Sequence, residues 1–172
     1  MLTKIDLCSM ALLKLGEAPI QSLTDNSAAS QLARTLYDPV IDALLASHSW
    51  RFATRTYDLA RTADGDFLLP ADVLRVLRCD GRIVGNRIQA PGPRLSIQAL
   101  VRMPSESFPG YFASLAATKL AMEFCIPLVG EQSVFRMLTA LYETEFQSAK
   151  FIDSSAAKSG VIDDFSLLSV RY

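Results

Sequence analysis

The sequence is poor in the residues that enzymes most often use for chemistry. Its 172 residues contain a single histidine, His48, so a Ser/His/Asp or Cys/His arrangement could only be built around that residue. The cysteines Cys8, Cys79 and Cys125 lie far apart, and no C-x-x-C pair is present. This spacing indicates neither a zinc site nor a disulfide framework, and each cysteine lies in an apolar run typical of a buried thiol. We therefore expect no catalytic residues, no metal ligands and no cofactor.

Motifs that hold phosphates or metal ions are also missing. The patterns G-x-G-x-x-G, G-x-x-x-x-G-K-[ST] and H-E-x-x-H do not occur. Asp64 and Asp66 resemble the start of a calcium loop, but Arg75 stands where such a loop needs a glutamate. No apolar run approaches the roughly 18 residues that cross a bilayer, and the N-terminus lacks a signal-peptide core, so we expect no membrane segment.

Charge is distributed unevenly along the chain. The net charge is −1, yet residues 51–102 contain nine of the twelve arginines, no lysine and five acidic residues. Arginine has a planar fork that suits carboxylate and phosphate partners, so this segment is the candidate region for polar contacts. An ordinary solvated β surface is the alternative interpretation.

Apolar periodicity predicts four helices. Thr3 is a suitable N-cap for the first helix, and Gly16 is a suitable residue to follow its end. Asn26 or Ser27 caps the second, whose apolar strip keeps its phase across Pro39 and thereby favours one kinked helix over two. Pro109 opens the third helix, and Pro127 is expected to lie beyond its end. The predicted helices span residues 4–15, 28–47, 109–126 and 131–150.

The segment between the second and third helices predicts a small antiparallel β region over residues 51–102. Residues 73–79 and 95–101 have the pattern of strands, and residues 83–84 and 87–89 can pair around Gly85 and Asn86. Trp50 is interpreted as a core anchor. The predicted fold is mainly α with a small antiparallel β insert: a four-helix bundle-like core plus an extended C-terminal tail. The domain covers residues 1–150, and residues 151–172 form a flexible linker and a docking tail.

Two of the predicted helices have more apolar surface than one core face needs. The third is apolar almost all round, which indicates burial on more than one side, and a second copy of the chain could supply one partner. The fourth has two neighbouring apolar strips, which form either one wide core face or a core face and an interface. Together with two strand arginines, these helices give the candidates for a subunit interface: Tyr111, Leu115, Met122, Phe135, Tyr142, Arg75 and Arg78.

The C-terminal residues differ from the rest of the chain. Residues 153–160 have the composition of a flexible linker, and residues 161–172 are rich in apolar side chains without room for a core. Such a segment docks on a partner or folds back on its own domain, and the sequence leaves both open.

Several segments follow one another in a fixed order and spacing along the chain: residues 11–20 (ALLKLGEAPI), 21–23 (QSL), 48–53 (HSWRFA), 67–76 (FLLPADVLRV) and the aromatic helix after Phe108 and Pro109. In these segments the sequence resembles the tail tubular protein A family, the head-to-tail adaptors of short-tailed phages. Pro39 departs from the second helix of that family.

The resemblance implies a structural virion protein of the phage neck, made in the host bacterial cytoplasm, and not an enzyme. It implies a homo-oligomeric ring, typically a dodecamer, that binds the portal protein and offers a platform to the next, nozzle- or stopper-like tail component. DNA would pass through the channel at genome ejection without sequence-specific binding. The resemblance further implies a portal-docking tail with the anchors Phe165, Leu167, Leu168, Val170 and Tyr172.

Where the arginines of residues 51–102 face is a separate expectation. A continuous basic lining would grip phosphates and slow DNA passage, so they should face other subunits or the next tail component. The alternative function is a small DNA-binding or regulatory helical protein that uses this region. Basic and aromatic residues interleave in residues 50–57, although the five acidic residues nearby weaken that interpretation.

Overall fold

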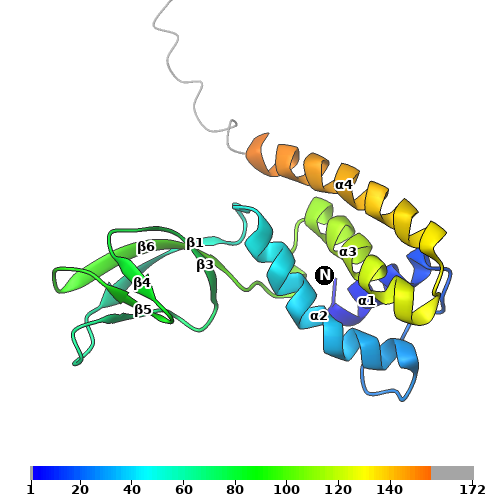
Figure 1. Ribbon diagram of the computed structural model, residues 1–172, viewed down its shortest axis with the longest axis horizontal. Coiled ribbons are helices and arrows are strands. Elements are labelled where there is room, and N and C mark those ends of the chain that lie inside the picture. The colour runs from blue at the N-terminus through cyan, green and yellow to red at the C-terminus, as the bar shows by residue number, and fades with distance from the viewer. Residues whose placement is uncertain (1, 156–172) are drawn as a thin grey trace, which may run out of the picture.

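Helices and sheets occupy opposite ends of the molecule in the computed structural model, which describes residues 2–155 (Figure 1). The strands are all antiparallel and form two three-stranded sheets, ordered β1-β6-β3 and β2-β5-β4. The elements are α1 (Lys4–Lys14), α2 (Ala28–Ser47), β1 (Thr54–Ala60), β2 (Phe67–Leu68), β3 (Val73–Cys79), β4 (Arg82–Val84), β5 (Arg87–Gln89), β6 (Arg94–Val101), a short 3-10 helix (Ser105–Ser107), α3 (Gly110–Leu128) and α4 (Gln132–Ser155).

The fold is mixed, and the prediction of a mainly α bundle with a small insert was too simple. Four helices surround one core, but the β region has a second core of its own. That second core is formed by one face of the sheet β1-β6-β3 and the inner residues of the smaller sheet, namely Phe67, Ile88, Leu95, Ile97 and Ala99. The antiparallel β region predicted over residues 51–102 is confirmed, as is the strand over 73–79.

Local signals set the boundaries of the first two helices. Thr3 and Asp6 form a capping box at α1, in which the Thr3 side chain accepts from the Asp6 N–H and the Asp6 carboxylate accepts from the Thr3 N–H. Gly16 follows α1 with φ +77, a conformation that favours glycine. Ser27 caps α2, which contains Pro39 within a single helix as predicted.

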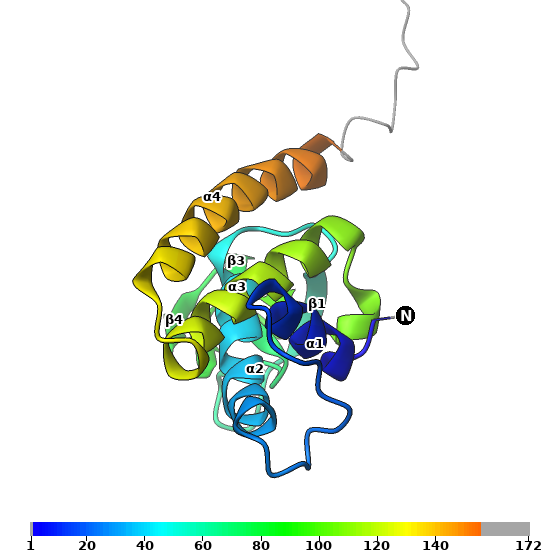
Figure 2. The same ribbon diagram turned by 90° about the vertical axis from the view of Figure 1, so that its right-hand side faces the viewer.

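Helix α3 lies at the centre of the helical part, between α4 on one side and α1 and α2 on the other (Figures 1 and 2). This arrangement explains why α3 is apolar almost all round, because three helices of the same chain cover it. Burial of α3 therefore does not require a second copy. The helix also continues through Pro127 to Leu128, so the predicted end before that proline was wrong. Pro127 has no N–H to donate to the Glu123 carbonyl, so it costs one backbone hydrogen bond, and the helix ends one residue later.

Helix α4 is longer than predicted. It continues five residues beyond Lys150, to Ser155, through the start of the segment interpreted as a linker. Asp153 accounts for the difference, because its carboxylate is buried and accepts hydrogen bonds from the Arg51 backbone and the Tyr111 hydroxyl. Residues 156–172 lie outside the described residues, and the predicted docking tail lies among them.

Trp50 joins the helical part to the β region, and the prediction of a core anchor is confirmed. Its side chain is fully buried, and its Nε1–H donates to the Leu44 carbonyl at 3.0 Å. The indole also makes edge-to-face contacts with Phe112 and Phe146. The aromatic ring thus fixes the end of α2 against α3 and α4, just before the chain enters β1.

Candidate functional site

A polar hollow opens on one face of the sheet β1-β6-β3, next to the end of α2. We call it the arginine hollow; it measures about 520 Å³ and is lined by Ser49, Arg51, Thr54, Leu77, Arg78 and Gln98. Arg75 reaches its edge, where its Nη2 donates to the Ser49 Oγ at 3.2 Å. Three arginine side chains therefore gather at one place, and two of them, Arg75 and Arg78, are predicted interface residues.

Strand alternation places the polar lining of this hollow. Thr56, Gln98 and Arg78 lie opposite one another across the sheet, on one face, whereas their neighbours Tyr57 and Ile97 face the second core. One face of this sheet is therefore buried, and part of the other lines the arginine hollow.

An irregularity in β3 brings the two strand arginines together. Arg75 and Arg78 are three residues apart, and in a regular strand they would point to opposite faces. A register shift between Val76 and Arg78 changes the alternation, so that Arg75 pairs with Leu100 and Arg78 with Gln98. Leu100 and Gln98 are two residues apart on β6 and share a face. The β-bulge therefore creates the cluster.

The charge of the arginine hollow is uncompensated within its lining. Arg51 and Arg78 line it, no acidic side chain does, and neither guanidinium makes an ion pair among residues 2–155. Hydroxyl and amide groups from Ser49, Thr54 and Gln98 add hydrogen-bonding capacity. This set of donors suits a carboxylate or a phosphate.

Asp153 fixes the backbone of the segment that carries Arg51. Its two carboxylate oxygens accept from the Arg51 backbone N–H at 3.0 and 3.3 Å, and Oδ1 also accepts from the Tyr111 hydroxyl at 2.7 Å. Burial and the hydrogen bond to Asp153 raise the pKa of Tyr111. These bonds attach the end of α4 to the segment that carries Arg51. Tyr111, a predicted interface residue, is engaged inside the chain.

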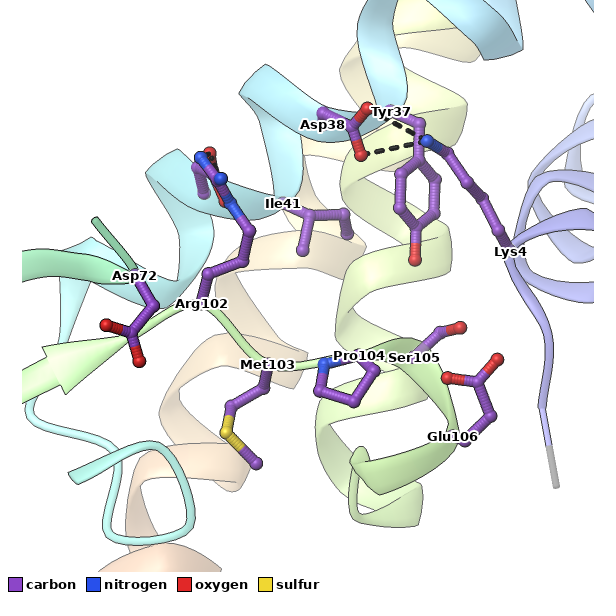
Figure 3. Close-up of a pocket in the computed structure, with 11 residues that line it drawn as sticks. Lys4, Tyr37, Asp38, Ile41, Asp72, Arg102, Met103, Pro104, Ser105 and Glu106 are labelled. Carbon is purple, nitrogen blue, oxygen red and sulfur yellow. Dashed lines mark hydrogen bonds and ion pairs between the residues drawn. The ribbon is translucent and has the colours of Figure 1, made fainter. Parts of the chain in front are cut away.

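A second hollow, the acidic cleft, lies between the start of α1, the middle of α2 and the segment that joins β6 to α3 (Figure 3). Its volume is about 460 Å³. The four acidic side chains that line it are Asp38, Asp42, Asp72 and Glu106, and the two basic ones are Lys4 and Arg102.

Ion pairs neutralise part of the acidic cleft. The Lys4 ammonium contacts the Asp38 carboxylate at 2.8 Å, and Arg102 donates through Nε and Nη2 to Asp42. Asp72 and Glu106 make no ion pair within the described part of the chain. The lining therefore retains an excess of two negative charges, which lie at Asp72 and Glu106.

The third surface is a row of exposed apolar side chains along α4. We call it the outer row: Met137, Leu141, Phe151 and Ile152, with Phe151 72% and Met137 62% exposed. Positions 137, 141, 151 and 152 fall on one side of a helix that turns every 3.6 residues. The neighbouring side of α4 packs on the core through Leu138 and Ala149.

The residues singled out for chemistry have structural surroundings. His48 caps α2 and lies edge-on to Trp50, with 4.8 Å between ring centroids. Burial, followed by the charge of Lys150, lowers the pKa of His48. Burial raises the pKa of Cys8 to about 12 and also raises the pKa of Cys125, which disfavours a reactive thiolate at either position.

No metal site is evident in the part of the chain that the structure describes: no group of three or more His, Cys, Asp or Glu side chains there is placed to hold an ion. Asp64 and Asp66 lie in a turn and contact Arg87 at 3.0 and 3.9 Å. Among the described helices, none combines the length and the apolar character of a membrane span.

The remaining interface candidates are divided between the core and its margin. Leu115 is fully buried and Met122 is 8% exposed, both inside the chain. Phe135 and Tyr142 are half-buried and pack against the helical core. The sequence interpretation missed Asp153, which lies in a segment with the composition of a linker, and also missed the hollow itself, because a β-bulge leaves no sequence signal here.

No protein-family model matches the sequence, and no curated protein is significantly similar to it.

Proposed function

We propose that this chain is a structural virion protein, a head-to-tail adaptor that forms a ring beneath the portal of a phage capsid. The ring extends the DNA channel and provides a platform for the next tail component. Support comes from where the resembling segments lie in the fold: residues 48–53 form the α2–β1 junction around Trp50, and residues 67–76 run from β2 into β3. These segments connect the helical part to the β region and form part of its two sheets.

The observation that carries the proposal is the outer row of α4. Large apolar side chains exposed on one side of a helix mark a surface that another protein covers, because a monomeric protein rarely exposes a large apolar patch to water. The row comprises Met137 and Leu141 in the first half of α4 and Phe151 and Ile152 near the last described residue, Ser155. We assign the portal as its partner, because α4 leads directly into the segment that the resemblance places on the portal.

The tail anchors extend this portal-facing side. Under the proposal, Phe165, Leu167, Leu168, Val170 and Tyr172 dock on the portal beyond the outer row. Each tail alone binds with moderate affinity, but about a dozen tails engage one ring together, and their avidity greatly exceeds the single affinity. Buried apolar area contributes roughly 25 cal/mol per Å² before the costs of association. DNA passes through the assembled channel without sequence-specific contacts.

The experiment mixes the full-length chain with the portal protein encoded in the same phage genome. The unaltered chain should form rings on the portal that are visible by electron microscopy and by the mass of the complex. A double variant, Met137→Glu with Phe151→Glu, should weaken this association about ten-fold or more, because it places charges where an apolar contact is needed.

The matched control is Leu13→Glu. Leu13 is 61% exposed on α1, outside the outer row, so the same substitution there should leave portal binding unchanged. An unaltered chain that ignores the portal contradicts the adaptor function. Normal rings from the double variant contradict only the role of the outer row.

The arginine hollow favours a second candidate function, a small DNA-binding or regulatory protein. Arg51, Arg75 and Arg78 lie around one hollow without acidic lining, which suits a phosphate backbone as well as a carboxylate. This function predicts duplex binding whose affinity falls steeply as salt increases and which Arg51→Ala and Arg78→Ala weaken. Absence of duplex binding at low salt would exclude it.

A further inference from the structure

The arginine hollow and the acidic cleft lie on opposite sides of the sheet β1-β6-β3. The hollow opens on the face that carries Thr56, Gln98 and Arg78. On the other face, Tyr57 donates a hydrogen bond to Asp72 at 2.6 Å, and Asp72 lines the acidic cleft. Arg55, which shares that face with Tyr57, contacts Met103 in the same lining.

The two surfaces are complementary in charge. The arginine hollow is lined by two positive side chains and has Arg75 at its edge, with no acidic side chain in its lining. The acidic cleft has an excess of two negative charges after its internal ion pairs, at Asp72 and Glu106.

We infer that neighbouring copies of this chain contact each other head to tail, with the arginine hollow of one copy against the acidic cleft of the next. The inference rests on the proposed function and adds to it the surfaces that join the ring. Arg78 of one copy is assigned to the Glu106 carboxylate on the other, and Asp72, at the opposite end of the cleft (Figure 3), adds to its negative charge. Arginine suits this role, because its planar fork binds a carboxylate in a bidentate manner.

The symmetry of the contact follows from the placement of the charges. A two-fold contact would have to place the hollow of each copy against the cleft of the other within one interface, and two surfaces on opposite sides of the sheet do not allow this. A contact between two different surfaces is heterologous and repeats from copy to copy, so it generates a closed ring when the rotation closes. The alternative occupant of the arginine hollow is the phosphate backbone of DNA. That contact would involve the hollow alone and would give the acidic cleft no partner.

The first test is a charge-swap series in the full-length chain, assembled on the portal of the same phage. Arg78→Glu and Glu106→Arg should each reduce the number of copies bound per portal, with the apparent affinity between copies falling about ten-fold or more. The combined variant, Arg78→Glu with Glu106→Arg, restores opposite charges across every boundary of the ring and should recover most of the loss.

The matched control is Arg82→Glu, which reverses an exposed arginine on β4 that lies in neither surface. It should assemble like the unaltered chain. Thermal melts of all variants establish that they are folded, and both test positions are exposed on the folded chain.

The outcomes separate the inference from the proposed function. Normal rings from both single variants, or no recovery in the combined variant, overturn the head-to-tail contact and leave the adaptor function intact.

If the unaltered chain does not bind the portal, the adaptor function fails. Sedimentation of the chain alone at rising concentration then tests the head-to-tail contact. Self-association that follows the charge-swap pattern supports it, and a chain that stays monomeric at every concentration overturns it. An Arg78→Glu variant that loses only duplex binding assigns the hollow to DNA.

Discussion

At the scale of single residues, Asp153 is structurally important although it lies in a segment with the composition of a linker. It is 3% exposed, and its carboxylate accepts from a backbone N–H and from a phenol on another helix. Removing such an acceptor leaves two donors without partners in a partly buried site, and each orphaned donor is costly. Asp153 thus holds the last described turn of α4 against α3 and fixes the backbone that carries Arg51.

The substitution Asp153→Ala should lower the free energy of unfolding by about 2 to 3 kcal/mol. Tyr111→Phe removes only one of the bonds and should cost about 1 kcal/mol. The control Tyr142→Phe removes a hydroxyl of α4 that makes no hydrogen bond within residues 2–155, so it should change little. Urea titration of the three variants measures the differences; equal losses in both tyrosine variants would contradict the assignment.

His48 makes the stability depend on pH. Its pKa in the folded chain lies below the ordinary value of 6.5, chiefly because burial disfavours the imidazolium, so the unfolded chain binds more protons near that pH. The free energy of unfolding should therefore decrease as pH falls below about 6.5 and should level off below the folded pKa. His48→Gln should remove this dependence between about pH 5.5 and 8, where carboxylates remain ionised. If the free energy of unfolding still depends on pH in this window in the variant, a group other than His48 causes the dependence.

At the scale of elements, the hairpin of β4 and β5 depends on one close approach. A Cβ on Gly81 would lie 2.8 Å from both the Gln89 carbonyl oxygen and the Ile88 Cγ2, and 2.9 Å from the Ala90 Cβ. Two of these neighbours cannot move without shifting the backbone of the hairpin. Ile88 is a fully buried member of the second core, so the shift would reach that core as well.

Gly81→Ala should therefore destabilise the chain by about 1 to 3 kcal/mol, the usual range for overpacking. Gly110→Ala is the matched control, because a Cβ there meets nothing within 4 Å and the residue begins α3. The control should be neutral or stabilising by up to about 1 kcal/mol, because alanine reduces the freedom of the unfolded chain. Thermal melts compare the two, and an equal loss in both would contradict the role of the close approach.

At the scale of the whole molecule, the chain contains two cores joined through β6. Leu100 belongs to the helical core, while Leu95, Ile97 and Ala99 of the same strand belong to the second core. One strand thus reaches from the helical part into the β region. Regions with separate cores can open separately, each with its own free energy.

Phe67→Ala tests this division. Phe67 is fully buried in the second core, and its truncation should cost about 3 to 5 kcal/mol there. Amide hydrogen exchange should lose protection in the strands around it while α1, α2 and α3 retain theirs. Phe124→Ala, an equal truncation in the helical core, should instead lower protection in all helices. A uniform loss of protection in both variants would show a single cooperative unit.

Local signals in the sequence by themselves determined much of the secondary structure. The capping residue Thr3, the glycine after α1 and the period of α2 were sufficient to place both helices, and α2 has the predicted bounds. The strand pattern of residues 73–79, the alternation over residues 95–101 and the Gly85–Asn86 turn were sufficient for β3, β4, β5 and β6. These features depend on neighbours within a few residues, and such interactions are visible in the sequence.

The tertiary structure alone decided the features that depend on contacts between distant residues. Asp153 extends α4 because Arg51 and Tyr111, far away in the chain, donate to it. A register shift against β6 places Arg75 and Arg78 on one face, and the packing of the small sheet makes a second core. Each of these features depends on contacts between segments that are far apart in the sequence, and local sequence patterns do not show such contacts. The surfaces proposed to join copies of this protein are therefore products of tertiary structure, although their charges were present in the sequence.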